Sequence, residues 1–268
     1  MFVYWAKADD GADLARILNN SMAEQVKICP ERFIPFGTLP LQAPEMAIVE
    51  MHRCVSEYNF KGFIIGTHIN EWGLDSPELI PFWELAEELE VCIFVHPIDL
   101  QIKGKHRKEP GFLPKLVGMP AEMCHAVSCI LTGGILEKFP RLKVCFAHGA
   151  GTFPYVRDQL QEAFMNAKVN ELDTLTSPPN LYAGKILCDS LVAGSQASSF
   201  LFDVMHPEQV LLGSDYPSPL GQVTFDSNPK YFKDSLNDMF PNLHAVAKAK
   251  VLGKNAGEFL GLVEEEIL

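Results

Sequence analysis

The chain has 268 residues, of which 47% are hydrophobic, so it is long enough to bury a sizeable core in one large domain or two small ones. Its 34 acidic and 22 basic residues give a net charge of −12, which argues against nucleic-acid binding or attachment to an anionic membrane as the main function. The apolar runs are far shorter than the roughly 20 residues that a membrane-spanning helix needs, so we expect no membrane partner.

Short apolar runs alternate with amphipathic segments along the chain. In chain order they predict a strand at 33–39, a helix at 43–58, a strand at 62–68, a helix at 76–90, a strand at 91–96, a helix at 119–139, strands at 142–148 and 185–190, a helix at 195–205 and a strand at 210–215. Ser76 precedes a proline, and its hydroxyl is expected to cap the helix that follows. The strands are apolar throughout, which is typical of a parallel sheet buried on both faces.

The fold class follows from this alternation, which predicts βα units with right-handed crossovers. We interpret residues 1–268 as a single domain, because no low-complexity linker or change of composition divides the chain. Neither GxGxxG nor GxxxxGK[ST] occurs, although an open nucleotide-binding sheet would carry such a turn after an early strand. The sequence therefore favours a barrel, in which functional groups stand at the C-terminal ends of several strands.

Three of the predicted strands end on a side chain that can bind a metal, namely His96, His148 and Asp215. Imidazole and carboxylate donors suit Zn²⁺ or another borderline divalent cation, and such an ion lowers the pKa of bound water from about 15.7 towards 7. One of the three could instead act as an acid or base. His68 also ends a predicted strand, and we interpret it as structural.

The seven cysteines predict free thiols rather than disulfides. Cys92, Cys145 and Cys188 lie inside apolar runs, and no CxxC motif occurs. The N-terminus shows no basic segment followed by a long apolar one, so we expect no secretory signal and a cytoplasmic location.

Several longer motifs are spread in order along almost the whole chain. They are YWAK (4–7), ILNN (17–20), GTLPLQAPE (37–45), GTHINEW (66–72), FVHP (94–97), LVGMPAE (116–122), LEKFPRLKVCFAHG (136–149) and LLGSDYPSPLG (212–221). This set closely resembles the 2-amino-3-carboxymuconate-6-semialdehyde decarboxylases, a family of zinc enzymes of the amidohydrolase superfamily in tryptophan (kynurenine) catabolism.

The resemblance implies a (β/α)8 TIM barrel with one Zn²⁺ per chain. It implies that His96 and Asp215 bind the metal and that His148 is the acid/base, while the substrate-binding residues stay unknown. The implied reaction is a non-oxidative decarboxylation of a small-molecule substrate, which limits the formation of quinolinate and NAD. The implied assembly is a monomer or a homodimer.

The chain also departs from the family pattern. It contains no HxH pair, which the family places on its first strand, and Met1 aligns just after the second strand, so we expect an incomplete barrel with strands 3 to 8 only. Gln159 stands where the family has an arginine that crosses a dimer interface, with Arg157 two residues earlier, and Lys115 replaces an aromatic residue. Two alternatives therefore stay open: a related amidohydrolase-type decarboxylase or hydrolase, and a non-catalytic truncated relative that dimerises with the full-length enzyme.

Overall fold

A six-stranded parallel sheet forms the centre of the computed structural model, which describes residues 2–98, 114–166, 175–217, 240 and 242–262. The strand order is β1-β2-β5-β6-β7-β8, so neighbours in the sheet are also neighbours in the chain. These strands are β1 (Phe36–Gly37), β2 (Gly62–Gly66), β5 (Cys92–His96), β6 (Lys143–Phe146), β7 (Leu187–Asp189) and β8 (Val210–Leu211). Consecutive parallel strands with helices between them form the α/β architecture of the (β/α) barrels.

All six predicted strands are present, but most are shorter than the sequence suggested. The predicted strand at 33–39 pairs only at residues 36–37, the one at 142–148 ends at Phe146, and the one at 210–215 ends at Leu211. His148 and Asp215 therefore lie on turns beyond their strands, whereas His96 is the last residue of β5. A small antiparallel pair, β3 (His68–Ile69) with β4 (Trp72–Gly73), follows β2 and was not predicted.

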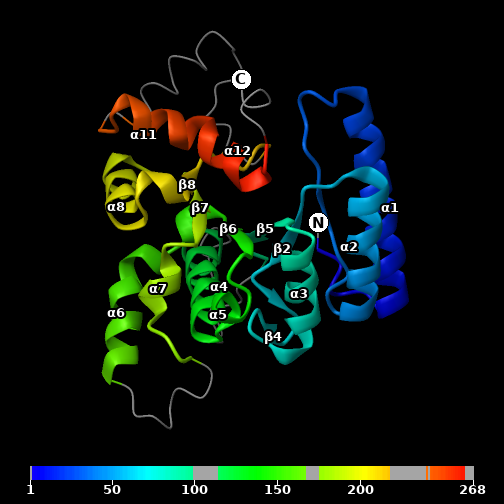
Figure 1. Cartoon of the computed structure of the whole chain (residues 1–268), viewed down its shortest axis with the longest axis horizontal. Coiled ribbons are helices and arrows are strands. Elements are labelled where there is room, and N and C mark those ends of the chain that lie inside the picture. Colours follow the sequence, from blue (N-terminus) through cyan, green and yellow to red (C-terminus); the bar gives the residue numbers. More distant parts are fainter. Residues whose placement is uncertain (1, 99–113, 167–174, 218–239, 241, 263–268) are drawn as a thin grey trace.

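Helices pack around the outside of the sheet. In Figure 1 they follow one another from α1 and α2 on the right, through α3, α4 and α5, to α6 and α7 at the lower left and α8 and α11 at the upper left. The bounds are α1 Ala8–Ile28, α2 Pro44–Tyr58, α3 Ile80–Glu88, α4 Met119–Thr132, α5 Ile135–Lys138, α6 Phe153–Asn166, α7 Pro179–Ala183, α8 Ser195–Met205, α11 Ala245–Ala249 and α12 Asn255–Leu260. The predicted helices 43–58 and 195–205 are confirmed.

Two details of the predicted helices are wrong. The segment 119–139 is not one helix, because Gly134 adopts a left-handed φ of 71° and separates α4 from α5. Ser76 does occupy the capping position before Pro77, but its side chain makes no capping hydrogen bond to the short 3-10 helix Pro77–Leu79 that precedes α3. The other part of the expectation is correct, because Pro77 does stand at the first helical position.

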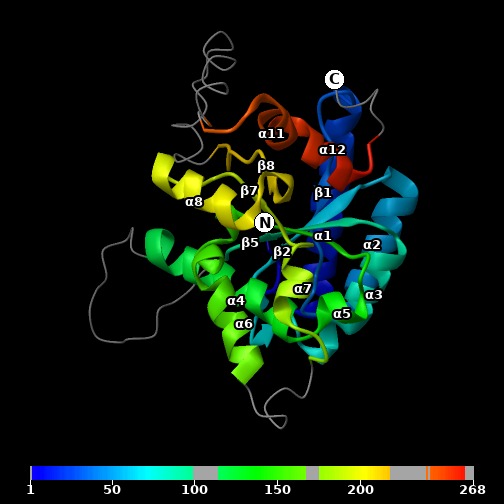
Figure 2. The same ribbon diagram turned by 60° about the vertical axis from the view of Figure 1, so that its left-hand side comes forward.

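Helix α12 packs against the sheet and contacts β8, and Figure 2 shows it near β1 and β8. Phe259 of α12 packs with Cys92, Cys145 and Leu211 in a buried apolar cluster, and the Cys92 thiol donates to the Phe259 carbonyl oxygen at 2.8 Å. All seven cysteines are free and Cys92, Cys145 and Cys188 are buried, as predicted.

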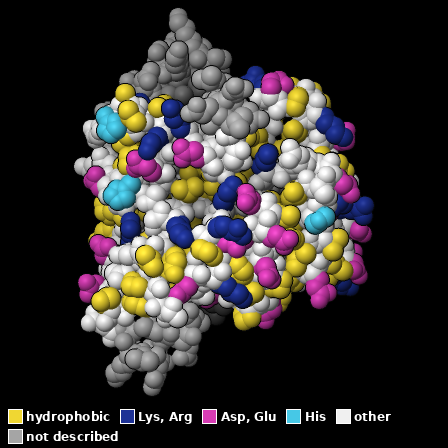
Figure 3. Space-filling view, in the orientation of Figure 1, with side chains coloured by type: hydrophobic (Ala, Val, Ile, Leu, Met, Phe, Trp, Pro, Cys, Tyr) yellow, Lys and Arg dark blue, Asp and Glu magenta, His cyan; other side chains and the backbone are white. Residues whose placement is uncertain are grey.

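The surface carries mixed charge. On the face shown in Figure 3, acidic, basic and apolar side chains are interspersed, and neither sign of charge gathers in one large patch. Among the described residues, no helix is long and apolar enough to cross a membrane.

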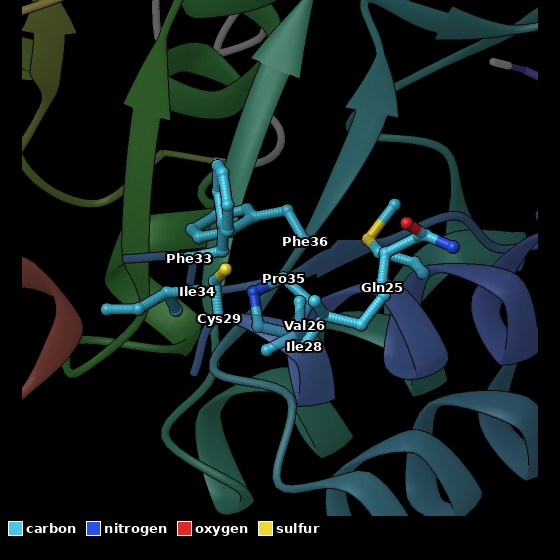
Figure 4. Close-up of a pocket in the computed structure, with 9 residues that line it drawn as sticks. Gln25, Val26, Ile28, Cys29, Phe33, Ile34, Pro35 and Phe36 are labelled. Atoms are coloured by element: carbon cyan, nitrogen blue, oxygen red, sulfur yellow. The ribbon is translucent and has the colours of Figure 1, made fainter. Parts of the chain in front are cut away.

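An apolar groove runs beside β1, which is one edge of the described sheet. It has a volume of about 460 Å³ and lies between the last turn of α1 and the segment that leads into β1 (Figure 4). The rings of Phe33 and Phe36 and the side chains of Val26 and Ile28 line it, and Phe33 is 58% exposed. An exposed apolar groove along a free strand edge is a surface on which association is favourable.

A buried polar network joins α1, α2 and the residue after β1. Asn19 of α1 donates to the Thr38 carbonyl oxygen at 2.9 Å and to the Glu50 carboxylate at 2.8 Å, while its own oxygen accepts from the Thr38 N–H at 2.8 Å. Arg53 closes the network with an ion pair to Glu50 at 2.7 Å. Burial raises the pKa of Glu50, but the hydrogen bonds from Arg53 and Asn19 together lower it by more. The pKa of Glu50 therefore lies below its ordinary value of about 4.5.

Glu50→Gln is expected to lower the free energy of unfolding by about 1–3 kcal/mol at neutral pH, because it removes a charge-assisted interaction from a buried network. The pKa of Glu50 is lower in the folded chain than its ordinary value, so its contribution is present above that value and is lost as the pH falls through the folded pKa. Urea denaturation of both proteins at several pH values tests this. A difference that grows rather than shrinks on acidification would contradict it.

Candidate active site

Four neighbouring strands each deliver one polar side chain to the C-terminal end of the sheet. His96 ends β5, His148 follows β6, Asp189 ends β7 and Asp215 follows β8. The ligand-type atoms of His96, His148 and Asp215 all lie within 4.8 Å of one another. The fold therefore brings to one place three residues that lie 52 and 67 positions apart in the chain.

His96 presents a free ring nitrogen to this cluster. Its Nδ1 lies 2.9 Å from the Pro97 carbonyl oxygen, which can only accept a hydrogen bond, so Nδ1 carries the hydrogen and the neutral ring keeps its lone pair on Nε2. Nε2 faces Asp215 Oδ1 at 3.5 Å. A metal-binding histidine usually donates its other ring N–H to a carbonyl or carboxylate in this way.

His148 reaches the cluster through an unusual turn. His148, Gly149 and Ala150 have φ values of 55°, 59° and 61°, and residues other than glycine rarely adopt this left-handed region. The His148 ring lies 5.2 Å from the His96 ring, centroid to centroid, in an edge-on arrangement. Burial lowers the pKa of His148, the neighbouring charge of Asp189 raises it, and the net shift is downward, so the neutral ring is favoured.

Asp189 lies at the same end of the sheet, and the sequence interpretation did not single it out. It is 5% exposed, and its Oδ1 accepts the N–H groups of Gly149 and Leu191, both at 3.0 Å. Burial raises its pKa, while His148 and these amide groups act in the opposite direction. The signal was present in the sequence, because the apolar run ILCD (186–189) ends on a carboxylate just as the other runs end on His96 or Asp215.

The donor set fits one divalent cation. Two ligand atoms that each lie about 2.0–2.2 Å from a tetrahedral ion are about 3.3–3.6 Å apart, and the Nε2 of His96 and Oδ1 of Asp215 are separated by 3.5 Å. Both side chains are partly exposed, at 26% and 30%, so an ion held between them would also be open to a ligand from solution. Among the described residues, this cluster is the one group of three or more such side chains with that geometry.

Two aromatic residues near the N-terminus, Phe2 and Tyr4, lie close to His96 or to the strand beside it. The Phe2 ring lies 6.4 Å from the His96 ring and 5.7 Å from the Tyr4 ring. Tyr4 is buried, its hydroxyl accepts the Gly66 N–H at 3.1 Å, and burial raises the pKa of that hydroxyl. Because Gly66 of β2 pairs with His96 of β5, Tyr4 contacts the strand next to the one that carries His96.

His68 lies outside the cluster. Its Nδ1 donates to the Asn70 carbonyl oxygen at 2.9 Å, and its Nε2 is 3.7 Å from the carboxylate of Glu122, which is 3% exposed. The same Glu122 oxygen accepts hydrogen bonds from the Thr67 hydroxyl and the Ile98 N–H. Glu122 thus links the end of β2 to the segment after β5 through hydrogen bonds, and His68 lies next to its carboxylate.

Three residues where the chain departs from the family pattern have other surroundings or contacts than the cluster among the described residues. Lys115 and Gln159 are exposed. Arg157 of α6 donates to the Val204 carbonyl oxygen at 2.7 Å and to Asn180 at 3.3 Å, so it fastens α6 to the neighbouring helices.

Comparison with known proteins identifies the family. The amidohydrolase family model matches residues 1–262. The chain is 41% identical over 264 residues to the 2-amino-3-carboxymuconate-6-semialdehyde decarboxylase of Dictyostelium discoideum, covering 98% of this chain and 70% of that protein. It is 31% identical over 272 residues to the enzyme of the same name from Caenorhabditis elegans, covering 83% of this chain and 67% of that protein.

A solved structure supports the fold and shows a metal in a relative. The 5-carboxyvanillate decarboxylase of Novosphingobium aromaticivorans, solved with manganese and 4-hydroxy-3-methoxy-5-nitrobenzoic acid, superposes with a TM-score of 0.79 at 24% identity, over 96% of this chain and 72% of that one. The (β/α)-barrel expectation is thereby confirmed at the level of fold. From the matched family model and the two decarboxylase relatives, the chain belongs to the amidohydrolase family and is one of its decarboxylases.

Proposed function

We propose that the chain catalyses the zinc-dependent, non-oxidative decarboxylation of 2-amino-3-carboxymuconate 6-semialdehyde, a step of tryptophan catabolism that limits the formation of quinolinate and NAD. The observation that carries the proposal is the cluster of His96, His148 and Asp215, whose donor atoms lie within 4.8 Å of one another. The choice of substrate is supported by the two relatives with that activity in their names, at 41% and 31% identity.

His96 and Asp215 would hold the cation, because their donor atoms have the separation that one tetrahedral ion requires. Zinc is proposed because mixed imidazole and carboxylate donors suit it, although a related structure holds manganese. When bound, a divalent cation supplies Lewis-acid polarisation next to the reacting group. The three side chains come from different strands, so the packed sheet rather than local chain geometry fixes their spacing.

His148 would move the proton. Loss of CO₂ breaks a carbon–carbon bond and leaves the electron pair on the carbon that carried the carboxylate, and that carbon takes up one proton in the net reaction. Burial lowers the pKa of His148, which favours the neutral ring, and a neutral imidazole can accept a proton and return it. The Phe2 ring, 6.4 Å from the His96 ring, adds an apolar neighbour to this end of the site.

The test combines metal analysis with a substrate panel. Protein purified without chelators is expected to contain close to one zinc per chain and to release CO₂ from 2-amino-3-carboxymuconate 6-semialdehyde, with loss of both after chelation and recovery on adding zinc. The panel includes γ-resorcylate and 5-carboxyvanillate. CO₂ from an aromatic acid alone would assign a related decarboxylase, and no CO₂ from any of them with zinc bound would overturn the proposal.

A further inference from the structure

Asp189 lies between two segments that carry functional side chains. Strand β7, which it ends, stands between β6 and β8 in the sheet, and Asp189 pairs with Leu211 of β8. At 5% exposure it is the most buried of the four polar residues at this end of the sheet. A buried carboxylate needs hydrogen-bond donors around it, so the groups that supply them show what it holds in place.

On one side, Asp189 holds the turn after β6. Its Oδ1 accepts the Gly149 N–H at 3.0 Å, in the middle of three successive residues with left-handed φ. His148 and Ala150 are strained in this region, so the turn persists only where the surrounding structure holds it. A charged acceptor on the central amide does this, and a second amide, from Leu191 at 3.0 Å, orients the same oxygen.

On the other side, Asp189 supports the segment that leads to Asp215. A Cβ atom at Gly213 would lie 2.6 Å from the Cβ of Asp189, so the backbone there approaches the carboxylate as closely as only glycine allows. The neighbouring Ser190 hydroxyl accepts the Gly213 N–H at 3.3 Å. The end of β7 therefore contacts two segments: the turn that carries His148 and the segment after β8 that leads to Asp215.

We propose that Asp189 is a positioning residue whose carboxylate holds the left-handed turn that aims the His148 ring at His96 and Asp215. The inference rests on the proposed role of His148 as the group that moves the proton. Asp189 itself would not touch the substrate, since it is buried beneath the turn. It would act by fixing the direction of the His148 side chain.

The experiment compares Asp189→Asn with the unmodified chain and with Glu50→Gln. The asparagine keeps the size of the side chain but removes the charge that holds the turn. Glu50→Gln is the matched control, because it also neutralises a buried carboxylate with hydrogen bonds, but within the network between α1 and α2. The readouts are the ring ¹⁵N signals of His148 in histidine-labelled protein, zinc content, and kcat and KM for CO₂ release.

In Asp189→Asn, the ring signals of His148, assigned by their loss in His148→Gln, are expected to shift while those of exposed His52 stay in place. We expect kcat to fall about 10- to 100-fold, with KM within about 3-fold and zinc content unchanged. Glu50→Gln is expected to lower the melting temperature and leave kcat and the His148 signals unaltered. Unshifted His148 signals together with unchanged kcat in Asp189→Asn would overturn the inference.

A second variant tests the turn without touching the carboxylate. Gly149→Ala places a Cβ 2.6 Å from the Val192 side chain at a residue with φ of 59°, so the turn must shift. It is expected to give the same pattern of lowered kcat, retained zinc and moved His148 signals. Failure of the proposed function would appear as an inactive unmodified chain, whereas failure of this inference would appear as His148 signals that neither variant moves.

Discussion

His148→Ala is expected to retain its metal and to lower kcat about 10²- to 10⁴-fold, the range over which a positioned acid or base accelerates a reaction. The ring that would move the proton is removed, while the Nε2 of His96 and Oδ1 of Asp215 keep their 3.5 Å separation. Elemental analysis of the purified variant and steady-state kinetics of CO₂ release measure the two effects. His148→Gln, which restores a polar side chain without a titratable ring, is expected to be equally slow.

His52→Ala is the matched control for this variant, because His52 is an exposed histidine on α2, away from the cluster. It should keep both metal and turnover. If His148→Ala lost its metal along with its activity, His148 would be a ligand and not the group that moves the proton.

His96→Ala is expected to abolish stoichiometric metal binding and with it all turnover. His96 supplies the ring nitrogen that faces Asp215, and its hydrogen bond to the Pro97 carbonyl oxygen is what leaves that nitrogen free. Loss of a residue that supports a ligand weakens metal binding about 10- to 100-fold, so loss of the ligand itself should exceed that range. Zinc content after dialysis, and the affinity measured by competition with a chelating dye, test the expectation.

The fold must survive for that result to count. His96 is the last residue of β5 and its side chain is partly exposed, so we expect the variant to keep the fold and the same cooperative unfolding transition as the unmodified chain when the two are measured side by side. A folded His96→Ala protein that still holds one zinc per chain would show that the metal site lies elsewhere.

The six strands could be predicted because their signal is local. Gly62–Gly66 and Cys92–His96 are buried on both faces, so almost every side chain along them is apolar and the run can be recognised in the sequence. Helix α8 could be predicted over the same residues that it occupies, because its entry and its apolar face are also coded within a few residues. The predicted C-terminal ends of β6 and β8 lie two and four residues beyond the observed ends, at 148 and 215 instead of 146 and 211. The reason is that apolar residues continue in the sequence after the last hydrogen bonds of the sheet.

The direction of His148 could not be predicted from its strand. Phe146 pairs with Val95, so these two side chains share one face of the sheet, and His96, the next residue after Val95, points to the other face. Simple alternation would place residue 148 on the same face as Phe146, away from His96. The left-handed turn at residues 148–150 reverses this. That turn depends on Asp189, which is 41 residues away in the chain, and on the close approach of Gly151 to the Pro120 carbonyl oxygen.

By itself, the sequence determined that the chain is an α/β protein of parallel strands and that His96, His148 and Asp215 stand near strand ends, because burial and strand length are local properties. The tertiary structure alone decided that these side chains meet within 4.8 Å and that the buried Asp189 accepts a hydrogen bond from the turn after His148. Distances between side chains on different strands depend on register, on twist and on turns held by distant residues. No short stretch of the chain contains that information.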